Sequence, residues 1–141
     1  MYRWVDHTAE LELELEGTTE RQVLSDALDA LRELLEGDKP AVVPRAAGAH
    51  ADEPQYRAVH ASAGDRPALL AAWLEELLFL PESDGFIPLA VEKLSLEDGS
   101  LSATVVGCAG QPRALVKAVT YHRLQFERFE RGYRASVVFD V

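Results

Sequence analysis

Residues 10–16 read Glu-Leu-Glu-Leu-Glu-Leu-Glu, an unbroken alternation of charged and apolar side chains. Successive side chains of a β-strand point to opposite faces, so the leucines share one face and the glutamates share the other. A strand that is apolar on one face only is typical of an antiparallel sheet, because parallel strands are usually apolar on both faces. The stretch therefore predicts a half-buried antiparallel strand. A short strand over residues 2–5 is expected before it, with Asp6, His7 and Thr8 at a turn.

Two later segments have helical periodicity. The first begins with Thr19 as N-cap and Gln22 at the capping-box position, and Gly37 is expected to end it. The second begins at Asp65, carries Pro67 in its first turn and is expected to end near Leu80. Each segment places apolar residues three and four positions apart, which predicts two amphipathic helices packed on a sheet.

The rest of the chain reads as strands and loops. Asp98-Gly99 is typical of a hairpin turn between two of the predicted strands. A loop is expected at residues 81–85 and another at residues 108–112. The remaining predicted strands are 41–43, 56–63, 89–96, 101–107, 114–126 and 133–141. This order predicts an α+β fold, a single-domain antiparallel sheet sandwich with two packed helices spanning residues 1–141.

Charge and cysteine content narrow the function classes. The 141 residues include 14 basic and 24 acidic side chains, a net charge of −10. Because nucleic-acid binding depends on neutralising phosphates, direct nucleic-acid binding is not expected. An acidic surface suits a cation or the basic cleft of a partner protein. The lone Cys108 fits a reducing compartment, and no apolar run is long enough for a signal core or a membrane span, so a cytoplasmic location is expected.

Carboxylates gather at two places in the sequence. One is the segment 6–10, Asp-His-Thr-Ala-Glu, and the other is the end of the chain, Phe-Asp-Val. The Asp140 side chain and the α-carboxylate of Val141 can chelate one hard cation, and Glu10 would complete an oxygen-rich site for Ca²⁺, Mg²⁺ or Mn²⁺. The alternative is a solvated terminus without a site, and spacing alone favours that alternative.

Four motifs resemble the archease family. They are Asp-His-Thr-Ala-Glu at 6–10, Trp-Leu-Glu-Glu-Leu-Leu at 73–78, Val-Lys-Ala-Val-Thr-Tyr-His at 116–122 and Phe-Asp-Val at 139–141. The four motifs occur in the same order as in that family, and the resemblance extends over nearly the whole chain. The resemblance implies a small α+β protein that binds a divalent metal and assists the GTP-dependent RNA ligase of the RtcB type. It implies an activator rather than an enzyme, one that promotes ligase guanylylation and multiple turnover in tRNA splicing or RNA repair.

Carried onto this chain, the resemblance implies that Glu10, Asp140 and Val141 are the metal ligands. Position 10 holds Glu where the family usually has Asp, and the extra methylene favours the larger, more flexible shell of Ca²⁺, with Mg²⁺ and Mn²⁺ as alternatives. The loop before the Val-Lys-Ala motif is also shorter than is typical of the family. Near the site or in partner contact we expect Asp6, His7, Lys117 and His122, whereas Tyr121 is expected to pack. No catalytic or small-molecule cofactor-binding residue is assigned.

Two other functions remain open from the sequence. One is a stand-alone metal-dependent hydrolase that uses Asp6, His7 and Asp140 around the ion. The other is a metal-free adaptor protein that binds its partner by shape. The sequence contains no phosphate-binding glycine loop, nucleophile elbow or Cys/His zinc spacing, which argues against several common enzyme classes.

Overall fold

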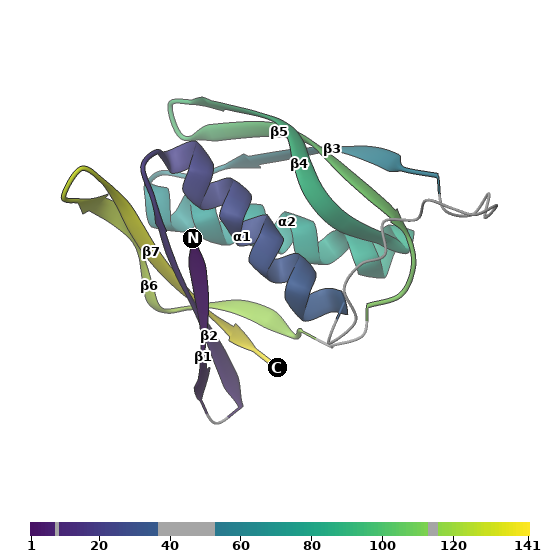
Figure 1. Cartoon of the computed structure of the whole chain (residues 1–141), viewed down its shortest axis with the longest axis horizontal. Helices are drawn as coiled ribbons and strands as arrows, with labels where there is room; N and C mark the ends of the chain where they lie inside the picture. Colours follow the sequence, from purple (N-terminus) through teal and green to yellow (C-terminus); the bar gives the residue numbers. More distant parts are fainter. Residues whose placement is uncertain (8, 37–52, 113–115) are drawn as a thin grey trace.

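Two helices and seven strands follow one another in the predicted order. The computed structural model describes residues 1–7, 9–36, 53–112 and 116–141. The elements, shown in Figure 1, are β1 (Tyr2–His7), β2 (Glu10–Gly17), α1 (Glu20–Glu36), β3 (Gln55–Ser62), α2 (Arg66–Asp84), β4 (Phe86–Glu97), β5 (Ser100–Ala109), β6 (Ala118–Phe129) and β7 (Gly132–Asp140). The predicted α+β sandwich with two packed helices is confirmed.

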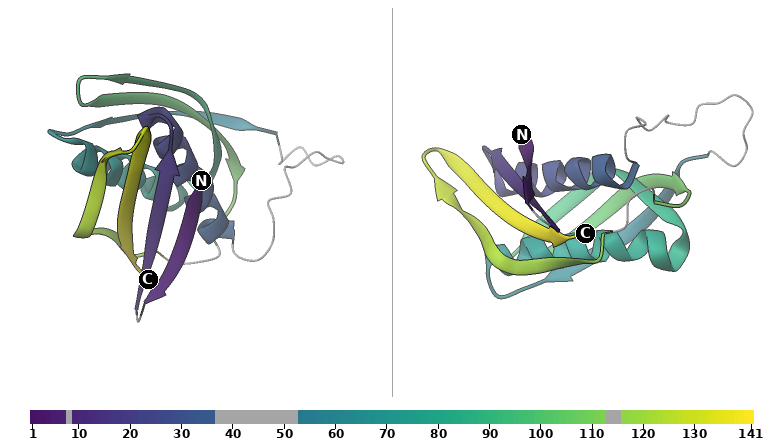
Figure 2. Two further views of the ribbon diagram at one scale, coloured as in Figure 1. Left: turned by 60° about the vertical axis from the view of Figure 1, so that its left-hand side comes forward. Right: turned by 90° about the horizontal axis from the view of Figure 1, so that it is seen from below.

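The strands form two antiparallel sheets. The four-stranded sheet has the order β1-β2-β7-β6 and the three-stranded sheet has the order β3-β5-β4. Since β2 pairs with β1 on one side and with β7 on the other, the first and last hairpins of the chain share one sheet. Figure 2 shows these four strands side by side, with the tip of the β1–β2 hairpin and the C-terminus at the same end.

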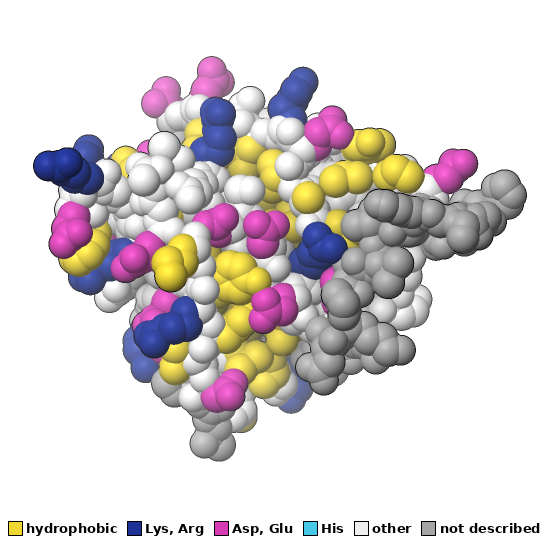
Figure 3. All heavy atoms as spheres, viewed as in Figure 1, with side chains coloured by type: hydrophobic (Ala, Val, Ile, Leu, Met, Phe, Trp, Pro, Cys, Tyr) yellow, Lys and Arg dark blue, Asp and Glu magenta, His cyan; other side chains and the backbone are white. Residues whose placement is uncertain are grey.

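The core lies where the helices meet the sheets, and each helix contacts strands of both sheets. Leu13 and Leu15 of β2 are buried while Glu16 is exposed, so the leucine face of residues 10–16 points into the core, as predicted. The buried Trp73 of α2 donates a hydrogen bond from its indole Nε1 to the Leu24 carbonyl of α1, 2.8 Å away, which joins the helices. The other side of α1 faces solvent, and Figure 3 shows acidic side chains spread over this face of the molecule.

The two helices begin at the same end of the molecule. The Thr19 hydroxyl accepts a hydrogen bond from the Gln22 amide at 3.0 Å, as a helix N-cap does. Asp65 caps α2 in the same way, accepting from the Ala68 amide at 2.8 Å. An ion pair of 3.0 Å between Arg66 and Glu20 joins the first turns of the helices. Both helices therefore run in the same direction, as Figure 1 shows.

Several predicted boundaries are wrong. The expected loop at 81–85 belongs mostly to α2, which passes through the buried Pro81 and ends at Asp84. The signal that ends the helix is Gly85, whose left-handed backbone (φ 62°) allows its amide to bond the Leu80 carbonyl. Burial of the apolar face offsets the hydrogen bond that Pro81 cannot make.

The strands also differ in length from the prediction. Asp6 and His7 belong to β1 rather than to a turn, because β2 begins early enough to pair with them. Cys108 belongs to β5, where it pairs with Ile87 of β4. Strand β6 begins at Ala118, not at position 114. The predicted strand at 41–43 and the predicted helix end at Gly37 lie outside the described residues.

Candidate metal site

Glu10 and Asp140 face one another across two neighbouring strands. Glu10 begins β2, Asp140 ends β7, and the two residues are directly paired in the antiparallel register. Residues paired in this way point to the same face of the sheet, with Cβ atoms about 4.5–5.5 Å apart. Both are half-buried. Two carboxylates separated by about 130 positions in the sequence are thus brought together at one end of the two central strands of the sheet.

Backbone hydrogen bonds hold this end of β7 on both sides. The Lys117 amide donates to the Asp140 carbonyl at 2.9 Å, and the Val141 amide donates to the Ala9 carbonyl at 3.4 Å. Ala9 itself has a left-handed backbone (φ 60°) in the turn between β1 and β2. The backbone oxygens of Ala9 and Asp140 thus each accept one hydrogen bond, which fixes the chain beside the Glu10 and Asp140 carboxylates.

The donor set is chemically suited to a hard cation. Like charges placed directly opposite on neighbouring strands destabilise a sheet, and a cation between them removes that cost. In the part of the chain that the structure describes, no basic side chain forms an ion pair with Glu10 or Asp140. The same described residues contain no group of three or more His, Cys, Asp or Glu side chains that could hold a metal. Ligation of a metal by Glu10 and Asp140 together with a third group therefore stays a prediction.

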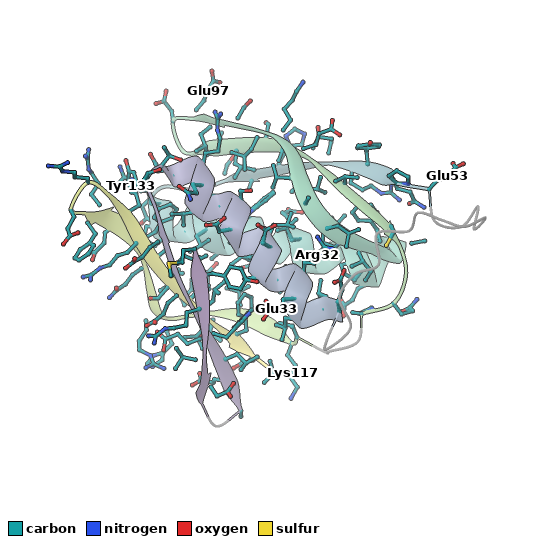
Figure 4. All side chains as sticks on the ribbon, in the orientation of Figure 1. Arg32, Glu33, Glu53, Glu97, Lys117 and Tyr133 are labelled. Atoms are coloured by element: carbon teal, nitrogen blue, oxygen red, sulfur yellow. The ribbon has the colours of Figure 1, made fainter. Side chains whose placement is uncertain are left out.

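The other residues predicted to lie near the metal site differ in their position relative to Glu10 and Asp140. His7 is the β1 residue paired with Glu10. Asp6 is paired with Leu11, so its exposed side chain lies on the face opposite Glu10 and Asp140. Lys117 directly precedes β6, beside the last residue of β7, and its side chain is exposed. Figure 4 shows Lys117 near the C-terminus and Tyr133 at the opposite end of the molecule.

His122 is not part of this group. Regular pairing of β6 with β7 stops after Thr120 and resumes at Gln125, and His122 lies between them with an exposed side chain. At about 3.3 Å per residue, it lies roughly 13 Å along the strand from Ala118, the β6 residue paired with Asp140. The structure therefore brings Glu10, Asp140 and Val141 to one end of the sheet and leaves His122 apart. Metal ligation by these residues stays a prediction.

Tyr121 corrects another expectation, because its side chain does not pack into the core. It is 64% exposed, and its hydroxyl donates a hydrogen bond to a Glu75 Oε1 of α2 at 3.1 Å. This hydrogen bond to a carboxylate, together with the negative charge of Glu75, raises the pKa of Tyr121. The register break after Thr120 explains the error, since strict alternation does not continue through it.

Phe79 is a surface feature that sequence reasoning missed. Its side chain is 59% exposed on α2, at the end of the molecule that carries the candidate metal site. A signal was present in the helical periodicity: at 100° per residue, position 79 falls opposite the buried face that includes Leu70, Leu74 and Leu77.

None of the helices described in the structure combines the length and apolar character needed to cross a membrane.

Comparisons with known proteins agree in sequence and in structure. The family model described as the archease protein family matches residues 2–141. A protein archease of Methanopyrus kandleri is 33% identical, over 97% of this chain and 96% of its own length. A protein archease of Methanosarcina acetivorans is 30% identical, over 99% of this chain and 95% of its own.

Two solved structures share the fold. Protein 1598 of Methanobacterium thermoautotrophicum has a TM-score of 0.68 at 24% identity, covering 99% of this chain and 98% of its own. An archease of Thermotoga maritima, described as a possible chaperone, has a TM-score of 0.66 at 22% identity, covering 100% of this chain and 98% of its own.

Proposed function

The chain belongs to the archease family, and from this premise we propose that it is a metal-binding protein cofactor of a GTP-dependent RNA ligase of the RtcB type. It promotes guanylylation of the ligase and its multiple turnover, in tRNA splicing or RNA repair, and performs no covalent step itself. Family membership is the single observation that carries this proposal. The register that pairs Glu10 with Asp140 supports its metal-binding part.

The proposed metal ligands are the side-chain carboxylates of Glu10 and Asp140 and the α-carboxylate of Val141. The cation, Ca²⁺ in the first place and Mg²⁺ or Mn²⁺ as alternatives, supplies positive charge between carboxylates that would otherwise repel one another. Hydrogen bonds from the Lys117 and Val141 amides fix the backbone on either side of Asp140, so that its side chain is held in place before a cation arrives.

The charge of the chain supports a basic partner surface. A net charge of −10 attracts a basic cleft over several ångströms and speeds encounter with it, whereas it repels free nucleic acid. The ligase, rather than its RNA substrate, is therefore the proposed direct partner. The proposal includes a cytoplasmic location, to which a sequence with a single cysteine is suited.

The test is guanylylation of the cognate ligase with GTP and divalent metal, with and without this protein. We expect stimulation at substoichiometric amounts, and we expect Asp140→Ala to abolish it. Glu16→Ala is the matched control, because Glu16 is an exposed carboxylate at the far end of β2, on the same face of the sheet as Glu10 and Asp140. Equal stimulation by wild type and Asp140→Ala would remove the metal site from the proposal.

Two outcomes would replace the proposal with another function. Hydrolysis of phosphoesters by the purified protein alone would indicate a metal-dependent hydrolase, although Asp6 and Asp140 lie on opposite faces of the sheet, which argues against a site that uses both. Ligase binding that persists unchanged after chelation of all divalent metal would indicate a metal-free adaptor.

A further inference from the structure

An apolar groove lies between α2 and the start of β6, next to the candidate metal site. Its volume is about 330 Å³. We call it the α2–β6 groove. Its apolar lining includes Leu35, Leu78, Phe79, Pro81, Val116 and Val119. Lys117 and Ala118 line it as well, and Ala118 is the β6 residue paired with Asp140. A molecule seated in the groove would therefore lie at the same end of the sheet as the candidate ligands, on the face that the helices cover.

Large apolar side chains are exposed around this groove. Phe79, which lines it, is 59% exposed. Tyr121 is 64% exposed and is held beside the groove by its hydrogen bond to Glu75, a lining residue. Leaving such rings in water forgoes part of the free energy that their burial would release. Exposed aromatic rings around a hollow are typical of protein–protein contact surfaces.

The charge around the groove selects the kind of occupant. Glu75 and Glu82 line it, and Lys117 is the single basic side chain among its described lining residues. Residues from the last turns of both helices, Leu35 and Pro81, also line it, so the negative ends of two helix dipoles are close by. Such surroundings favour a cationic group and disfavour phosphate. They also disfavour a second copy of this chain, whose net charge is −10.

We infer that the α2–β6 groove is the anchoring site for a segment of the ligase that presents an apolar side chain flanked by arginine or lysine. The apolar side chain fills the groove between Phe79 and Val119, and the flanking cation pairs with Glu75 or Glu82. This inference rests on the proposed function for the identity of the partner. Anchoring there would bring the ligase to the end of the sheet that carries the candidate metal site.

The test measures the affinity of the purified full-length chain for the purified ligase by calorimetry. We expect Phe79→Ala to weaken binding at least tenfold, and Glu75→Gln combined with Glu82→Gln to weaken it to a similar degree and to reduce its salt dependence. Tyr56→Ala is the matched control, since Tyr56 is 52% exposed on β3, in the other sheet. Because Phe79 is largely exposed, thermal unfolding of Phe79→Ala should match that of the wild type.

The outcomes separate this inference from the proposed function. Unchanged affinity of Phe79→Ala would overturn the anchoring site, even where Asp140→Ala still abolishes stimulation. Loss of affinity in Phe79→Ala and not in Tyr56→Ala would support the site, even where the wild type binds without stimulating guanylylation. Tight binding of ligase-free RNA that depends on Phe79 would overturn the inference, because it would make RNA the occupant.

Discussion

At the residue scale, the atoms around Gly107 of β5 leave no room for a side chain. A Cβ added there would lie 2.1 Å from the Ile87 carbonyl oxygen and 2.6 Å from the Phe86 ring. Neither neighbour is free to move, because the backbone oxygen belongs to the adjacent strand β4 and Phe86 is fully buried. Close approach of two strands thus requires glycine at this position.

We expect Gly107→Ala to lower the free energy of unfolding by about 3 kcal/mol or more, the upper end of the usual cost of overpacking. The matched control is Gly64→Ala, since an added Cβ at Gly64 meets nothing within 4 Å. Urea unfolding of the two variants measures the difference. Equal stability of both would mean that β4 and β5 separate readily at this point.

The candidate ligands show at the same scale what a sequence can provide. Strand alternation predicts that Glu10 points away from the leucines, and the structure confirms this orientation. Alternation cannot predict that Asp140 lies opposite Glu10, because that depends on which strands pair. The motifs shared with the archease family supplied this neighbour, and the register now accounts for it. Tyr121 was misjudged because a break in pairing has no local signature in the residues around it.

At the scale of elements, β1 is tied to α1 by Tyr2 and Glu33. The Tyr2 hydroxyl donates a hydrogen bond to the Glu33 carboxylate. Burial, this hydrogen bond and the charge of Glu33 raise the pKa of Tyr2 to about 12, from an ordinary value of 10.0. The folded state therefore holds the phenol proton more tightly than the unfolded state does.

The sign of the pH dependence follows from that difference. The contribution of Tyr2 to stability is fully present below pH 10 and is lost as the pH rises from about 10 through 12. We expect the melting temperature of the wild type to fall more steeply over this window than that of Tyr2→Phe. Tyr121→Phe serves as a comparison. The pKa of Tyr121 is also raised by a carboxylate, that of Glu75, but the Tyr121 side chain is exposed. Parallel pH profiles of wild type and Tyr2→Phe would contradict the role of Tyr2.

Elements were predicted well where a local cue fixes them, and less well where packing decides. Thr19 and Asp65 start the helices as expected, because an N-cap side chain acts within one turn. Pro81 was taken as a helix end, yet α2 continues to Asp84 because the buried face around Pro81 offsets the missing hydrogen bond. The α2–β6 groove has no sequence signature, since it exists only where two distant elements meet.

At the scale of the whole molecule, the two helix dipoles point in the same direction. Both helices begin at the end where Arg66 pairs with Glu20 and lies 5.2 Å above the Tyr133 ring. The turn of the β6–β7 hairpin is at this end too, and Figure 3 shows both basic and acidic side chains on that side of the face. The negative ends of the helix dipoles and the Glu10–Asp140 pair lie at the other end.

This polarity leads to a prediction on metal binding that does not involve the ligase. Ca²⁺ at a hundred times its dissociation constant should stabilise the folded protein by about 2.7 kcal/mol, a rise in melting temperature on the order of 8 °C for a chain of this length. Asp140→Asn should lose this response. Without metal, Asp140→Asn should be at least as stable as the wild type, because the repulsion between Glu10 and Asp140 is removed.

Thermal unfolding in chelator and in Ca²⁺ measures both effects on the same samples. Glu16→Gln is the control, since it removes one charge from the same face of β2 at the opposite end of the strand and should keep the Ca²⁺ response. A Ca²⁺ response that survives in Asp140→Asn would place the cation elsewhere in the chain. A metal-free Asp140→Asn protein less stable than the wild type would mean that Asp140 supports the fold through a contact of its own, and the like-charge argument for a cation between Glu10 and Asp140 would then fail.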